Sequence, residues 1–160
     1  MPFILPKDCL KYYQNIFDSK SKNGQKLKYK FDEYYFCLLA GLACAKYNKD
    51  AELDPNSQID EYPSEYQKCK DYIAGLLIAT EVKRRGIVTE DAFALESLMV
   101  EYIDSTSRTR LNRAGEMRLN QYASRGFELI QSKMGGKPYR LEMFLLDYLD
   151  CFQKGLFTKD

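Results

Sequence analysis

The sequence predicts an all-α protein, a compact single domain over residues 1–160 with about six helices around two buried central helices. Periodic segments repeat apolar residues at helical spacing, and none alternates with the period of two that marks a strand. Residues 31–47 and 65–85 are dense in apolar side chains, as buried helices are. A length of 160 residues suits one domain, and no long linker divides the chain.

The first central helix is expected over residues 31–47, because every residue of 34–45 is apolar, aromatic or small. Asp32 is a suitable N-cap, and Lys46 lies near the other end, where the helix dipole favours a positive charge. The run is shorter than the roughly 20 apolar residues that cross a bilayer. It therefore predicts a core helix and no membrane contact.

The second central helix is expected from Ser64 onward, with Gly86 placed to end it. The tripeptide Ala-Gly-Leu centres on Gly41 and again on Gly75, 34 residues later, but no third copy follows. Two copies do not define a repeat protein. We therefore expect the two central helices to cross closely through Gly41 and Gly75.

Four further helices are expected around this pair. Pro6 and Pro138 suit the first turns of two of them, and Thr89 suits the cap of another. An extended N-terminal arm, two loops and a turn at Asn23-Gly24 complete the pattern. The expected helices cover residues 7–18, 89–103, 112–133 and 138–152, the arm covers residues 1–5, and the loops cover residues 19–30 and 48–63.

Composition excludes several kinds of chemistry. The chain has no His, which removes the commonest general base, the commonest metal ligand and the Ser-His and Cys-His dyads. Its five Cys show no CxxC spacing, so neither a zinc site nor a redox motif is indicated. We expect no catalytic residue, no metal and no cofactor. Free structural thiols and an N-terminus unlike a signal peptide predict a cytoplasmic protein.

Basic residues are the most distinctive polar feature. The formal net charge of the whole chain is only +1, yet residues 104–140 alone carry a net +5. Guanidinium groups with nearby hydroxyls, at the start of a helix, suit phosphate oxygens. The alternative is a solvated helix face that pairs with acids of this chain or of a partner. The candidate contact residues for nucleic acid or an acidic partner are Lys83, Arg84, Arg85, Arg108, Arg110, Arg113, Arg118 and Arg125.

These features predict a non-catalytic accessory or adaptor subunit of a larger cytoplasmic complex, acting through protein–protein contacts in a nucleic-acid-processing assembly. The 13 Tyr and the opposed charge patches suit docking to other protein subunits or to a second copy of the chain. One alternative is a nucleic-acid-binding helical domain that uses the Arg108–Arg125 region. A second is an enzyme that uses Cys or carboxylates.

Overall fold

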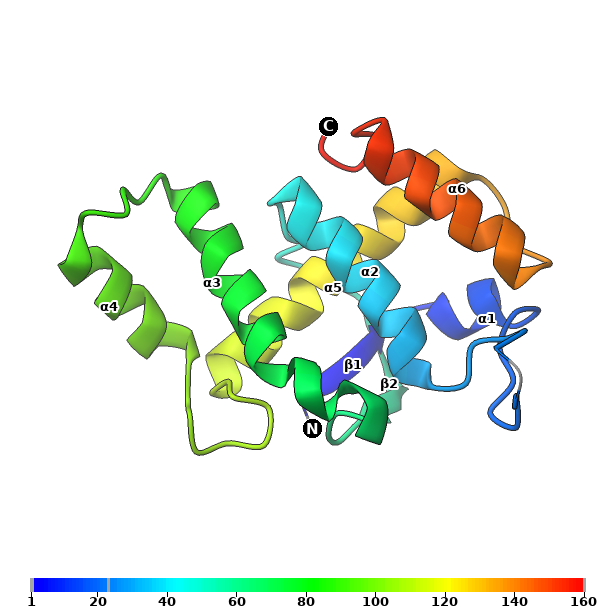
Figure 1. The fold of residues 1–160 in the computed structure, drawn as a ribbon, viewed down its shortest axis with the longest axis horizontal. Coiled ribbons are helices and arrows are strands. Elements are labelled where there is room, and N and C mark those ends of the chain that lie inside the picture. Colours follow the sequence, from blue (N-terminus) through cyan, green and yellow to red (C-terminus); the bar gives the residue numbers. More distant parts are fainter. Residues whose placement is uncertain (1, 23, 160) are drawn as a thin grey trace.

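A computed structural model describes residues 2–22 and 24–159 of the chain (Figure 1). The described residues form six α-helices, one 3-10 helix and a two-stranded sheet, so the prediction of a mainly helical protein is confirmed. The small sheet corrects the expectation of an all-α chain. In order, the elements are β1 (Phe3–Pro6), α1 (Cys9–Tyr13), α2 (Lys30–Cys44), β2 (Leu53–Ile59), η1 (Ser64–Cys69), α3 (Lys70–Arg85), α4 (Ala92–Tyr102), α5 (Arg113–Met134) and α6 (Leu141–Gln153).

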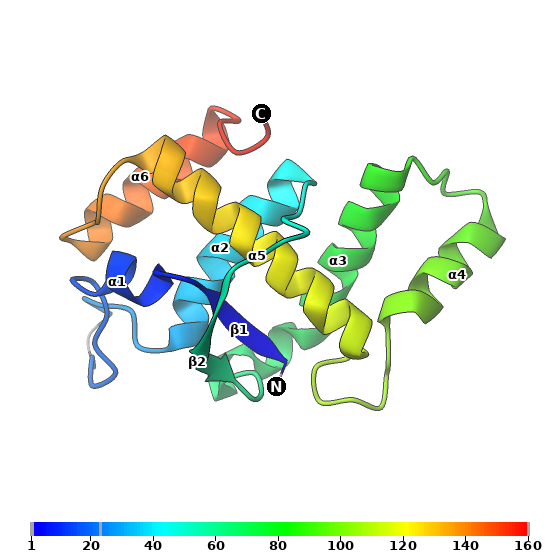
Figure 2. The same cartoon turned by 180° about the vertical axis from the view of Figure 1, so that it is seen from behind.

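The sheet pairs β1 with β2 in antiparallel register, with Phe3 opposite Ile59. It lies beside α5 on the face seen in Figure 2. Asn120 of α5 holds β1 in place: its Oδ1 accepts from Ile4 N at 3.2 Å, and its Nδ2 donates to Pro2 O at 3.1 Å. The N-terminal arm is therefore extended and packed, as predicted. The expectation that residues 48–63 form only a solvated loop is wrong, because β1 supplies their pairing partner.

The central pair of helices is α2 with α5, which cross at two glycines. A Cβ on Gly41 of α2 would lie 1.9 Å from the carbonyl oxygen of Tyr122. A Cβ on Gly126 of α5 would lie 1.6 Å from the carbonyl oxygen of Cys37. Around Gly75 of α3, by contrast, a Cβ would meet nothing within 4 Å. The predicted crossing of Gly41 with Gly75 is therefore wrong, and α3 is not one of the two central helices.

Several helix boundaries differ from those predicted. The helix α1 is a short turn of five residues, because Pro6 belongs to β1. The cap of α4 is Asp91 in place of Thr89, since Asp91 Oδ1 accepts from Ala94 N. The start of α5 agrees with prediction: Asn112 caps it by accepting from Gly115 N at 3.0 Å.

Residues with a left-handed backbone conformation lie at several of the predicted helix ends and turns. Gly86 ends α3 with φ 66°, as its position in the sequence predicts. Gly24 has φ 65°, but the predicted turn there also involves Asn23, which lies outside the described residues. Within residues 2–22 and 24–159, no helix has the length and apolar character that a bilayer crossing requires.

Candidate functional site

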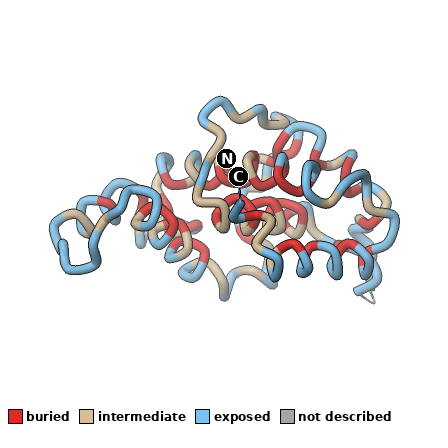
Figure 3. The backbone as a smooth tube through the Cα atoms, turned by 90° about the horizontal axis from the view of Figure 1, so that it is seen from above, coloured by how far each residue is buried: buried red, intermediate tan, exposed pale blue. Residues whose placement is uncertain are grey.

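The helices α3 and α4 form an arm, defined as residues 70–102, that extends from the α2–α5 body (Figure 1). Buried side chains of α3 anchor most of the arm, whereas α4 contributes only Leu98 and Tyr102. The buried residues of α3 are Ile73, Ala74, Leu77, Thr80 and Glu81. Viewed from above, the far end of the arm is almost entirely exposed or half-buried (Figure 3). The arm therefore presents most of its own surface to solvent.

The sequence of α4, AFALESLMVEY, places two large apolar residues on the outward side of the helix, among Glu96, Ser97 and Glu101. Large apolar residues on a helix normally face the core. Instead, Phe93 is 81% exposed and Val100 is 73% exposed. The two residues are seven apart, so they share one face of α4, opposite the buried Leu98. We name Phe93 and Val100 the α4 ridge.

A second apolar feature, the arm groove, lies between α3 and α4. Its volume is about 440 Å³. An ion pair between Arg110 Nε and Asp71 Oδ1, 3.0 Å apart, stands at its edge. Small side chains along α3 make it accessible, and Gly75 contributes no side chain at all. Its apolar lining consists of Ala74, Gly75, Ile78, Ala79, Met99 and Ile103.

The helix α6, which lies at the other end of the molecule (Figure 1), also exposes apolar side chains. Leu146 is 61% exposed and Leu149 is 54% exposed. Isolated exposed apolar residues are ordinary, whereas contiguous groups mark interaction surfaces. The protein thus has apolar surface on two separate elements, α4 and α6.

Three of the predicted basic residues converge on one buried carboxylate, Glu81 of α3. Arg84 donates to it from Nε at 3.0 Å and from Nη2 at 2.8 Å, and Arg85 donates from Nε at 3.0 Å. Arg118 Nη1 of α5 lies 3.6 Å from Glu81 Oε1. Tyr122 Oη donates to the same carboxylate. Arg118 and Tyr122 therefore join α5 to Glu81 of α3, and the three arginines do not form a free basic face.

The charge of Glu81 is stabilised by its partners. Burial alone would raise the pKa of Glu81, but hydrogen bonds from Arg84 and Tyr122 and the charge of Arg118 outweigh it and lower the pKa to about 2. The ring of Tyr47 lies against two of the guanidinium groups, 3.7 Å from Arg118 Cζ and 5.1 Å from Arg84 Cζ. The carboxylate of Glu81 therefore has a structural role, because both of its oxygens already accept hydrogen bonds.

Most of the other predicted contact residues also pair with acids. Arg108 lies 3.5 Å from Glu61, and Arg125 lies 3.0 Å from Glu128. Together with Arg110 at the arm groove, this leaves Lys83 and Arg113 as exposed members of the predicted set with no ion pair in the described part of the chain. The structure therefore does not gather the eight residues into one site, and phosphate contact stays a prediction.

The sequence did not predict the arm surface, because residues 89–103 were expected only as one of four helices around the central pair. Met99 of this helix is 49% exposed and borders the arm groove. The overlooked signal was the pair Phe93 and Val100, apolar residues at a spacing of seven on the outward side of the helix.

Comparison of the chain with protein-family models, with curated proteins and with solved structures gave no match. Functional inference consequently depends on the chain's own residues and their geometry.

Proposed function

We propose that this protein is a non-catalytic adaptor subunit that binds another protein through the α3–α4 arm. The observation that carries the proposal is the exposure of the α4 ridge, Phe93 and Val100, on the same arm as the apolar arm groove. Covering this surface removes apolar area from water, at roughly 25 cal/mol for each Å² buried. The exposed apolar face of α6 offers a second contact, which suits a subunit that joins two partners.

The shape of the arm groove favours a helix as the bound segment. An amphipathic helix places its apolar face into such grooves through side chains at helical spacing. Gly75 and its small neighbours Ala74 and Ala79 let the backbone of the incoming helix approach closely. The partner segment is therefore expected to carry apolar residues along one face and polar residues along the other.

The test uses a variant that fills the arm groove without disturbing the fold. Gly75→Met adds a side chain where a Cβ meets no atom within 4 Å, so the melting temperature should not fall. Affinity capture should yield a partner that, once purified, binds the parent protein. Gly75→Met and Phe93→Ser should each weaken this binding, whereas the control Leu146→Ser on α6 should not.

A second copy of the chain is one outcome of the same experiment. In that case sedimentation of the parent should show a dimer, and Gly75→Met should convert it to a monomer. The proposal is wrong if the purified partner binds Gly75→Met and Phe93→Ser as tightly as it binds the parent. It is equally wrong if the protein is monomeric and no reconstituted partner complex depends on the arm.

A further inference from the structure

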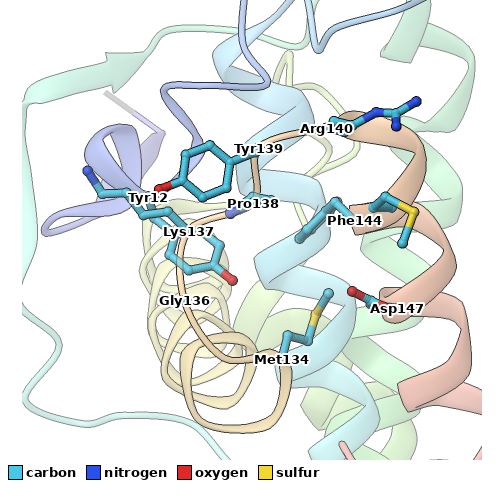
Figure 4. A pocket seen from close by; sticks show the side chains of 10 residues that line it. Tyr12, Met134, Gly136, Lys137, Pro138, Tyr139, Arg140, Phe144 and Asp147 are labelled. Atoms are coloured by element: carbon cyan, nitrogen blue, oxygen red, sulfur yellow. The ribbon is translucent and has the colours of Figure 1, made fainter.

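A pocket distant from the arm lies where α1 meets the segment that joins α5 to α6 (Figure 4). Three aromatic rings, those of Tyr12, Tyr139 and Phe144, and the thioethers of Met134 and Met143 line it. Its volume is about 290 Å³. Pockets for drug-sized ligands hold about 300–1,000 Å³. This pocket therefore suits a single chemical group, such as a small head group or the end of a side chain.

Two oxygen-bearing groups face each other across this pocket. Figure 4 shows the hydroxyl of Tyr12 and the carboxylate of Asp147 pointing inward from opposite walls. Within the described part of the chain, neither group has a hydrogen-bond partner or an ion pair. Burial, together with the negative charges of neighbouring groups that include Asp147, raises the pKa of Tyr12 to about 12. Tyr12 is therefore a neutral hydroxyl at physiological pH, and Asp147 supplies an unpaired negative charge.

The basic residues of the lining are turned outward. In Figure 4 the ammonium group of Lys137 and the guanidinium group of Arg140 both extend away from the space between the rings. Arg140 is also paired with Glu142. The lining thus combines the exposed ring of Tyr139, the edges of two rings that are otherwise buried, and two thioethers with the exposed carboxylate of Asp147. The positive charges point away from the pocket (Figure 4).

We propose that this pocket binds an alkylated ammonium group. A cation over the face of an aromatic ring is attracted by the ring quadrupole, and aromatic cages recognise quaternary ammonium ligands in this way. The methyl groups of such a cation match the apolar walls, while Asp147 balances its charge. Tyr139, which is 80% exposed at the rim, gains a contact that buries its ring.

Other ligand classes fit the pocket less well. An anion would meet the carboxylate of Asp147 inside a site whose basic groups point away. A neutral apolar group would cover Asp147 and leave a charge desolvated without a partner. A primary ammonium group carries three donors and holds its water strongly, so it needs more acceptors than Asp147 and Tyr12 provide. Alkylation of the nitrogen removes that requirement.

The same chemistry occurs in a free cation such as choline and in a trimethylated lysine of a peptide. The first measurement is a titration of the intact protein, followed by NMR, with choline and with 3,3-dimethylbutan-1-ol, its uncharged isostere. We expect saturable shifts at pocket residues with choline and roughly tenfold weaker binding of the isostere, the size of one cation–π contact. Titrations with a trimethyllysine peptide and its unmodified lysine counterpart then decide which source binds more tightly.

Variants that remove one charge distinguish a cation site from an anion site, because they change the ligand affinity in opposite directions in the two cases. Asp147→Asn should weaken the binding of choline, and Lys137→Gln should strengthen it or leave it unchanged. Tyr139→Ala should also weaken binding, and its exposed position protects the fold. Asp150→Asn is the matched control, because Asp150 lies on the same helix but pairs with Lys154 outside the pocket.

Three results would overturn the proposal. The first is that neither choline nor the trimethyllysine peptide shifts the pocket residues. The second is that the uncharged isostere binds as tightly as choline. The third is that Asp147→Asn strengthens ligand binding while Lys137→Gln weakens it, which is the pattern of an anion site. None of these results depends on the partner of the α3–α4 arm.

Discussion

Gly41 of α2 and Gly126 of α5 lie face to face where the two central helices cross. A Cβ built on either residue would come within 2 Å of a backbone carbonyl oxygen of the opposite helix. Rigid backbone atoms of this kind cannot move aside as the end of a flexible side chain can. The two glycines therefore set the separation of α2 and α5, and with it the position of the core.

Gly41→Ala should destabilise the protein by about 1–3 kcal/mol, because it forces the two helix backbones apart. Gly75→Ala is the matched control, since Gly75 has the same neighbours in sequence but open space around it. The control should gain up to about 1 kcal/mol from the higher helix propensity of alanine. Chemical denaturation of both variants measures the difference. Equal effects at the two positions would contradict the assigned crossing.

Glu81→Gln should destabilise the protein by about 3–5 kcal/mol, because it leaves the guanidinium groups of Arg84, Arg85 and Arg118 without their buried counter-charge. The folded-state pKa of Glu81 is lowered to about 2 from an ordinary value of 4.5. The contribution of Glu81 to the free energy of unfolding is thus present above pH 4.5 and is lost as pH falls toward 2. The difference in free energy of unfolding between the parent and Glu81→Gln should therefore decrease as pH falls from 4.5 to 2.

Glu101→Gln is the control for this variant, because the side chain of Glu101 is 41% exposed and contacts only one of the three arginines, Arg85. It should cost about 1 kcal/mol or less, as exposed ion pairs do. Denaturant titrations between pH 2 and 7 provide the measurement. A loss for Glu81→Gln no larger than that for Glu101→Gln would argue against a structural role for the cluster.

Glu33→Gln should make the protein more stable at neutral and alkaline pH. Glu33 is fully buried, and neither of its oxygens has a hydrogen-bond partner in the described residues. Burial, followed by the charge of Asp32, raises its pKa from 4.5 to about 8. A raised pKa means that its stabilising contribution is complete below pH 4.5 and declines by about 1.4 kcal/mol per pH unit up to pH 8.

The glutamine side chain does not titrate, so the advantage of Glu33→Gln should grow from pH 5 to pH 8 and then level off. At pH 7 we expect a gain on the order of 1–3 kcal/mol. Glu90→Gln is the control, because Glu90 is exposed. Parallel pH profiles of stability for parent and Glu33→Gln would show that Glu33 ionises normally in the folded protein.

The nucleic-acid alternative makes a separate prediction about Lys83 and Arg113, the two members of the predicted contact set that have no ion pair within residues 2–22 and 24–159. Because the other candidates pair with carboxylates, we expect the parent to bind no DNA or RNA even at about 50 mM salt, where the electrostatic contribution is strong. Fluorescence anisotropy with duplex DNA and single-stranded RNA measures this. Salt-dependent binding that the double variant Lys83→Ala/Arg113→Ala abolishes would restore the alternative.

Local signals in the sequence determined most of the helices. Apolar residues at helical spacing predicted α2, α3 and α5, because side chains three and four residues apart share a helix face. Asn112 marked the start of α5 by its capping side chain, and Gly86 marked the end of α3 by its left-handed backbone. Each of these effects acts within a few residues along the chain, so the sequence alone is enough to read it.

Only the tertiary structure decided which surfaces meet. Gly41 and Gly75 have the same neighbours in sequence, yet only Gly41 faces another backbone, that of α5. The arginines around Glu81 resembled a solvent-facing basic patch in the sequence, but in the fold all three pair with the buried carboxylate of Glu81. Phe93 is 81% exposed because α4 lies at the edge of the molecule (Figure 1), a position that its own sequence does not set. Contacts between distant segments depend on the path of the whole chain, because a residue's type sets what it can contact and the fold sets what lies within its reach.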